Sequence, residues 1–156
     1  MENEIINPEW YQVAEIELVY KTKVKPSQRP QITSSVDTFK ILRQIWNPDK
    51  IEMIEEFKVL FLNRNNKVLG VFDASCGGIT GTVADPRIIL AAAVKSNAVS
   101  MILAHNHPSG SSKPSRADEE LTTKIKEAAK YFDMRVIDHV IITVEEYYSF
   151  ADEGIL

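Results

Sequence analysis

The 156-residue sequence contains one cysteine, Cys76, and no apolar run long enough to cross a membrane. A single cysteine excludes an internal disulfide framework and agrees with a reducing, cytoplasmic compartment. A transmembrane helix needs about eighteen or more consecutive apolar residues, so no membrane span is expected. Residues 1–4, MENE, are acidic and lead into no apolar core segment, so no secretory signal is expected either.

The chain also lacks an excess of positive charge, because 18 Lys and Arg stand against 22 Asp and Glu, for a net charge of −4. Proteins that hold duplex DNA through its phosphates generally need a concentrated basic face. Lys21, Lys23, Lys25 and Arg29 form the one basic cluster. Alternating lysines have a plainer explanation, since they keep exposed sheet edges from pairing with other chains. A nucleic-acid partner is therefore permitted but not favoured.

Repeats and low-complexity segments are absent, and the 44% hydrophobic content is that of an ordinary globular domain. Residues 10–24 alternate loosely and are rich in β-branched and aromatic residues, which predicts a strand. The prolines of 26–30, PSQRP, break that strand and form a short linker. We therefore divide the chain into an N-terminal extension, residues 1–33, and one domain, residues 34–156.

The domain alternates helical and strand patterns, which predicts an α/β fold with a mixed β-sheet covered by helices. Capping residues and hydrophobic periodicity supply the boundaries. The predicted elements are a helix from Ser34 to Asn47, a β-hairpin over 57–72, a helix over 87–96, a strand over 99–104, a helix over 116–132, a strand over 134–143 and a short tail at 148–150.

Residues 105–118, HNHPSGSSKPSRAD, gather three potential metal ligands at one strand-to-helix junction. Residues i and i+2 of a strand point to the same face, so His105 and His107 should project together. Pro108 and the turn residues after it end the strand, and Ser115 opens the next helix with Asp118 in its first turn. Two neutral imidazoles and one carboxylate, with a fourth position left for water, form a catalytic zinc set.

Each part of this pattern also has a purely structural interpretation. Ser115-x-x-Asp118 is a helix capping box, and an acid in the first turn is favoured by the helix dipole. His-x-His at the end of a strand is also found as a pair of surface polar residues. The conjunction of a buried strand, His-x-His, a Gly/Ser/Pro loop and Ser-x-x-Asp favours the metal site.

The spacing His105-x-His107-Pro108, six residues, Ser115, two residues, Asp118 resembles the JAMM signature, H-x-H-P-x6-S-x2-D, of the JAB1/MPN metallopeptidases position by position. Three segments resemble the RadC-type bacterial proteins more narrowly: GGITGTVADPR at 77–87, ILAHNHPSG at 102–110 and DHVII at 138–142. The resemblance implies a cytidine-deaminase-like α/β fold. It also implies a zinc-dependent hydrolase that cleaves a peptide or isopeptide bond of a protein or peptide substrate through a zinc-activated water.

The resemblance also implies roles for particular residues. His105, His107 and Asp118 match the zinc ligands. Glu56, directly before the strand at 57, matches the general acid/base, and Glu55 is its competitor because the sequence does not fix which neighbour points inward. Ser115 matches the serine that stabilises the oxyanion, although the helix cap also needs its hydroxyl.

His139, inside the apolar segment 136–142, is expected to be a buried core histidine with no ligand role, and Cys76 is expected to be a small loop or core residue. Deamination is excluded, because zinc deaminases need H-x-E and P-C-x-x-C motifs. The alternative function is a DNA-repair-associated accessory or nucleic-acid-processing protein without peptidase activity, as the repair name of RadC-type proteins implies. Residues 1–33 do not resemble the helix-hairpin-helix segment that such proteins often carry.

Overall fold

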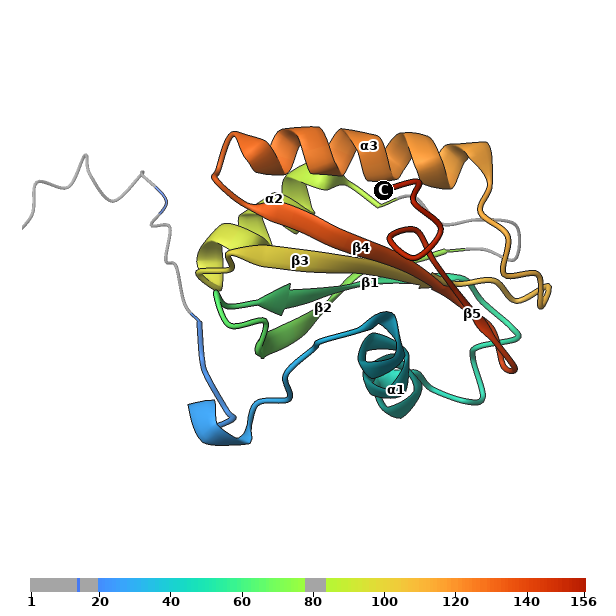
Figure 1. Cartoon of the computed structure of the whole chain (residues 1–156), viewed down its shortest axis with the longest axis horizontal. Helices are drawn as coiled ribbons and strands as arrows, with labels where there is room; N and C mark the ends of the chain where they lie inside the picture. The colour runs from blue at the N-terminus through green and yellow to red at the C-terminus, as the bar shows by residue number, and fades with distance from the viewer. Residues whose placement is uncertain (1–13, 15–19, 78–83) are drawn as a thin grey trace, which may run out of the picture.

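A computed structural model of the chain describes residue 14 and residues 20–77 and 84–156 (Figure 1). Its elements are η2 (Pro26–Gln28), α1 (Ser35–Ile45), β1 (Glu56–Leu62), β2 (Val68–Cys76), α2 (Pro86–Lys95), β3 (Ser100–Asn106), α3 (Arg116–Lys130), β4 (Arg135–Ile142) and β5 (Tyr147–Ser149). The strands form one five-stranded sheet in the order β2-β1-β3-β4-β5. Helices α2 and α3 cover one face and α1 covers the other, which confirms the predicted α/β fold.

The central strand β3 determines where the histidines at its C-terminal end can meet residues of α3. It pairs antiparallel with β1 and parallel with β4, and all seven of its residues are buried. Parallel neighbours need a crossover connection, and here that connection contains α3. The N-terminus of α3 therefore lies near the C-terminal end of β3.

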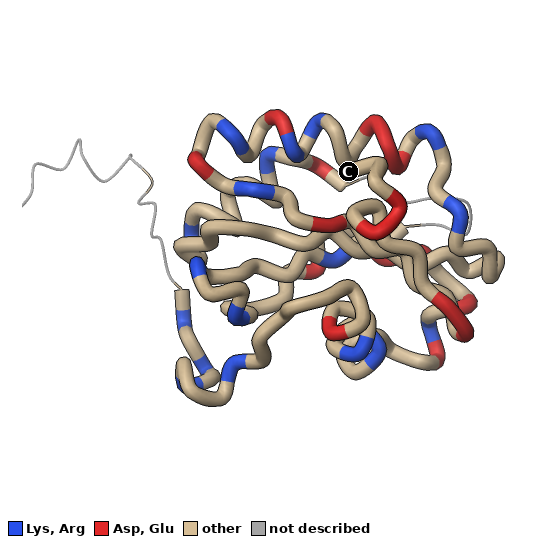
Figure 2. Tube along the Cα trace, in the orientation of Figure 1, with Lys and Arg blue, Asp and Glu red and all other residues tan. Residues whose placement is uncertain are grey.

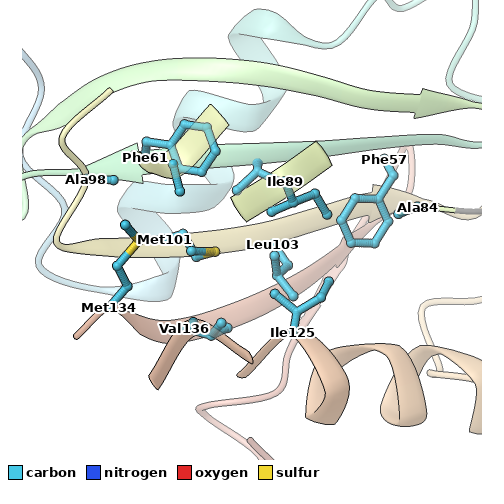
Figure 3. Close-up of a cluster of buried hydrophobic side chains, with 13 residues drawn as sticks. Phe57, Phe61, Ala84, Ile89, Ala98, Met101, Leu103, Ile125, Met134 and Val136 are labelled. Carbon is cyan, nitrogen blue, oxygen red and sulfur yellow. The ribbon is translucent and has the colours of Figure 1, made fainter. Parts of the chain in front are cut away.

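Two hydrophobic clusters fill the two faces of the sheet because side chains alternate along each strand. Phe57, Val59 and Phe61 of β1 pack with residues of β3, α2 and α3 on one face (Figure 3). Leu60 and Leu62 of the same strand pack toward α1 on the opposite face. The parity of a residue in β1 or β3, that is, whether its number is odd or even, thus decides which face of the sheet its side chain occupies.

The predicted helices and strands of the domain are present, with shifted boundaries. Strand β2 continues to Cys76 because it pairs with β1 along its whole length, up to the pair Glu56–Cys76. Strand β3 continues to Asn106, and the short strand β5 overlaps the predicted tail. Within the described residues, no helix combines the length and apolarity that a membrane crossing requires.

The strand predicted over 10–24 is wrong for residues 20–24, which form no strand. Residues 10–13 and 15–19 of that prediction lie outside the described residues. No side chain of residues 20–24 is buried, and Val24 is 49% exposed, so burial gives no gain to offset the cost of ordering a strand. Lys21, Lys23 and Lys25 are exposed on irregular chain, so the explanation that they protect a sheet edge does not apply.

Buried Asn106 ties the end of β3 to the segment before β1. Its Oδ1 accepts the backbone N–H of Glu56 at 2.8 Å, and its Nδ2 donates to the carbonyl oxygens of Ile51 at 2.7 Å and Ile54 at 2.9 Å. By parity its side chain lies on the α1 face, opposite the side chain of His105. These three bonds fix the backbone at 51–56 relative to the strand that carries His105.

We expect Asn106→Ala to lower the free energy of unfolding by about 2–4 kcal/mol, because buried polar groups of the backbone lose their partners. Chemical denaturation measures this change. Asn65→Ala is the control, since Asn65 lies in an exposed turn where its backbone makes the hydrogen bonds. That substitution should stay within about 0.5 kcal/mol of the wild type. Equal effects of the two substitutions would contradict the role given to Asn106.

Candidate metal centre

Three side chains that could bind a metal converge at the C-terminal end of β3. The Nε2 atoms of His105 and His107 lie 2.9 Å apart. Asp118 places Oδ1 at 3.3 Å from the first and Oδ2 at 3.7 Å from the second. Among the described residues, these three form the one group of His, Cys, Asp and Glu whose ligand atoms all lie within 4.8 Å of one another. The structure thus brings together the three residues predicted to hold zinc.

The backbone explains why these side chains meet. His107 follows β3, but its N–H still donates to the carbonyl oxygen of Ile142 in β4, at 3.1 Å. The chain therefore keeps its extended course, and His107 points to the same side as His105. Asp118 lies in the first turn of α3, where the helix dipole favours a carboxylate.

The spacing of the three groups fits a tetrahedral metal. With zinc–ligand distances of ~2.0–2.1 Å, neighbouring ligand atoms of a tetrahedron lie about 3.3–3.4 Å apart. The separations of 2.9, 3.3 and 3.7 Å at this site span that value. Imidazole nitrogen with carboxylate oxygen is also a donor set that zinc accepts. The residues present therefore fit zinc.

The ring of His107 is held in the orientation that a metal ligand requires. Its Nδ1 lies 2.6 Å from the carbonyl oxygen of Ser111, which can only accept a hydrogen bond. Nδ1 therefore carries the proton, and in the neutral ring Nε2 presents its lone pair toward His105. Metal-binding histidines are commonly fixed in this way by a partner on the other nitrogen.

The protonation states follow from burial and from the neighbouring charges. Burial by itself raises the pKa of Asp118, but its contacts with the imidazoles of His105 and His107 outweigh burial and hold that pKa well below its usual range. Asp118 is therefore a carboxylate at neutral pH. Its hydrogen bond in turn raises the pKa of His107. Burial lowers the pKa of His139 well below that of a free histidine, so this ring is neutral.

The structure does not bring Glu56 to this cluster, contrary to the prediction. The neighbouring Phe57 lies opposite His105 in the β1–β3 pairing, and the two rings stack with centroids 5.8 Å apart. The side chain of Glu56 alternates with that of Phe57 and so occupies the α1 face. There its Oε2 lies 3.8 Å from Lys58 Nζ, and Nζ lies 4.9 Å from the centre of the Trp46 ring.

Of the two adjacent acids, Glu55 lies on the side of the three candidate ligands. It directly precedes β1, and by parity it shares the face of Phe57 and His105. Its side chain is half-buried, and its charge contributes to the raised pKa of His107. Its backbone carbonyl accepts the N–H of Gly77 at 2.9 Å, which extends the β1–β2 pairing to this residue. The signal in the sequence was the i, i+2 spacing of Glu55 and Phe57, but the face of Phe57 was not known.

The hydroxyl of Ser115 belongs to the helix cap. Its Oγ accepts the N–H of Asp118 at 3.2 Å and donates its own proton to Asp118 Oδ2 at 2.7 Å. The backbone N–H of Ser115 donates to the same carboxylate oxygen at 2.7 Å, which completes a capping box. Of the two roles that the sequence left open, the structure shows the cap, and Ser115 thereby anchors a predicted ligand.

His139 and Cys76 lie outside the three-residue cluster. Cys76 is not the loop or core residue that was predicted, because it ends strand β2, paired with Glu56, and is exposed. His139 is fully buried, as predicted, but its Nε2 lies 2.8 Å from Nδ1 of His105. No local sequence pattern predicts this contact, since the two residues are 34 positions apart. The sequence held one signal for it. His139 lies in the strand predicted over 134–143, which comes after the helix predicted over 116–132.

Comparison with known proteins assigns the chain to a family. The profile of the RadC-like JAB domain matches residues 32–155. The chain belongs to the RadC-like JAB domain family. This confirms the resemblance to RadC-type proteins that the sequence motifs carried.

Three similar bacterial proteins bear the name UPF0758 protein. The one from Flavobacterium johnsoniae is 47% identical over 125 residues, which cover 80% of this chain and 53% of the relative. Escherichia coli YfjY is 41% identical over 102 residues, 65% of this chain and 64% of the relative. The Rubrobacter xylanophilus protein is 37% identical over 146 residues, which cover 92% of this chain and 62% of the relative. The matches thus span only about half to two-thirds of the length of these relatives, and their names state no activity.

We expect the purified protein to bind about one zinc ion per chain, because the three ligands form one open site. His107→Gln should weaken zinc binding by at least the ~10–100-fold that loss of a ligand's supporting partner costs. Elemental analysis and competition with a chelator measure both quantities. Glu120→Gln, at an exposed position of α3, is the control and should bind zinc as the wild type does. Wild-type zinc affinity in His107→Gln would refute the ligand assignment.

Proposed function

We propose that this chain is a zinc-dependent metallohydrolase of JAMM type that cleaves a peptide or isopeptide bond through a zinc-activated water. The observation that carries the proposal is the convergence of His105, His107 and Asp118 with one carboxylate, Glu55, on the same face. Three protein ligands leave a fourth position for water or substrate, which is the arrangement of catalytic zinc sites.

Zinc at this site would polarise the scissile carbonyl and lower the pKa of a water molecule. The chain's own residues do the rest. Glu55 takes the proton from the attacking water and delivers it to the leaving amine, which is the work of a general acid/base. Asp118, ionised and anchored by Ser115, keeps its place in the first turn of α3.

Ser115 positions a ligand in this proposal and does not stabilise the oxyanion. An oxyanion needs a hydrogen-bond donor aimed at it. The hydroxyl of Ser115 has one proton, and that proton is directed to Asp118 Oδ2 at 2.7 Å. The oxyanion role expected from the resemblance is therefore not part of the proposal.

A cleft beside His107 offers room for a substrate. It is lined by Glu52, by His107, Pro108 and Gly110, and by residues 143–146. Figure 2 shows acidic residues at the β4–β5 turn, where Glu145 and Glu146 belong to this lining. Carboxylates repel phosphates, so a protein or peptide substrate suits this cleft better than a nucleic acid. The basic segment 21–29 lies at the opposite end of the sheet from the start of α3 (Figure 1).

The choice between the adjacent acids is testable. Glu55→Gln should keep the fold and the zinc but lower turnover by ~10²–10⁴, the usual contribution of a positioned general acid/base. Glu56→Gln is the matched control on the α1 face and should retain most of the turnover. The measurement is kcat for a substrate obtained from a peptide and isopeptide library, with zinc content determined for each variant.

The opposite pattern, turnover lost in Glu56→Gln and kept in Glu55→Gln, would refute the assigned face. A zinc-loaded wild-type protein that cleaves nothing in the library would count against the peptidase. Salt-dependent binding to single-stranded or branched DNA would then favour the accessory function.

A further inference from the structure

A buried chain of hydrogen bonds runs from the predicted ligand His105 through His139 to Thr122 in α3. His105 Nδ1 lies 2.8 Å from His139 Nε2, and His139 Nδ1 lies 2.6 Å from Thr122 Oγ1. Both imidazoles are 0% exposed and Thr122 is 3% exposed. Thr122 Oγ1 also lies 2.6 Å from the backbone carbonyl oxygen of Asp118, one helical turn earlier.

The last partner fixes the direction of every proton in this chain. A carbonyl oxygen can only accept, so Thr122 gives its single hydroxyl proton to Asp118. Thr122 Oγ1 must then accept from His139 Nδ1–H. The neutral His139 ring is left with a lone pair on Nε2, which accepts the Nδ1–H of His105. His105 therefore keeps its Nε2 lone pair, and this atom faces His107 and Asp118.

We propose that His139 and Thr122 are positioning residues that set the tautomer and the ring orientation of His105 as a metal ligand. This inference rests on the proposed zinc site and extends it to a third histidine. The chain ends on the backbone of Asp118, so it also joins two ligands of one site through β4. His107 is held in the corresponding way by the Ser111 carbonyl, so each ligand histidine is oriented by a chain that ends on a backbone oxygen.

Aromatic packing keeps both rings in the plane that this chain needs. Phe57 stacks on His105, with an interplanar angle of 6°, and Phe150 stacks on His139 at 28° with centroids 4.6 Å apart. Buried polar groups are hydrogen-bonded in most proteins, so the hydrogen bonds of these side chains would by themselves indicate only a contribution to stability. The specific consequence here is that the tautomer of His105 depends on a hydroxyl two partners away.

Thr122→Val tests this dependence, because valine keeps the shape of threonine and removes the hydroxyl. It leaves His139 Nδ1–H without its acceptor, and zinc affinity should fall ~10–100-fold. Thr123→Val is the matched control, since the exposed Thr123 hydroxyl also donates to the carbonyl four residues earlier, that of Glu119, at 3.0 Å. Thr122→Ser retains a hydroxyl. Both of these variants should bind zinc as the wild type does, as measured by chelator competition.

Nitrogen-15 NMR of the imidazoles in the metal-free protein supplies a readout that stability alone does not move. In the wild type and in Thr123→Val, His105 should be protonated at Nδ1 and unprotonated at Nε2. In Thr122→Val the two tautomers should mix. A wild-type His105 protonated at Nε2 would overturn the inference whether or not the variants fold.

The zinc data separate this inference from the proposed function. A wild type that binds zinc, together with a Thr122→Val variant of equal affinity and unchanged tautomer, overturns the inference and leaves the metal site standing. A wild type that binds no zinc refutes the proposed site instead. The tautomer of His105 in that protein still decides whether His139 and Thr122 direct its protons.

Discussion

The parallel pairing of β3 with β4 is the constraint on which the rest of this structure depends. A parallel pair requires a crossover, and the crossover here contains α3, so the first turn of α3 meets the end of β3. Two histidines from the end of the strand and one aspartate from the helix then face one another without any strained backbone at the three positions. The sheet brings the strand end and the helix start together, and the loop between them supplies the Ser111 carbonyl that orients His107.

The same arrangement explains why polar groups collect at a buried position. Unpaired polar atoms are costly in a protein interior, and a buried imidazole needs partners for both nitrogens. His105 finds them in His139 on one side and in the facing ligand atoms on the other. Asn106 does the same on the opposite face, where its amide binds the segment that precedes β1. One strand end therefore organises both layers of the domain.

Much of this structure follows from local sequence patterns. Caps, periodicity and the spacing of His105, His107 and Asp118 are short-range signals, and they predicted the helices, the sheet and the cluster of three side chains. The sequence did not predict which of Glu55 and Glu56 faces the cluster, because shifting by one residue at the start of a strand moves a side chain to the other face. Only the pairing of Phe57 with His105 decides that Glu55 faces the cluster. The contact between His105 and His139 spans 34 positions, beyond the reach of any local pattern.

Asp118 takes part in this site twice, with its carboxylate and with its carbonyl oxygen. The carboxylate faces the histidines, and the carbonyl ends the hydrogen-bond chain that starts at His105. Opening the first turn of α3 would withdraw one ligand and release the ring of another in a single event. The lifetime of a bound metal would then be governed by the fraying rate of a helix end, a local motion that needs no unfolding of the sheet.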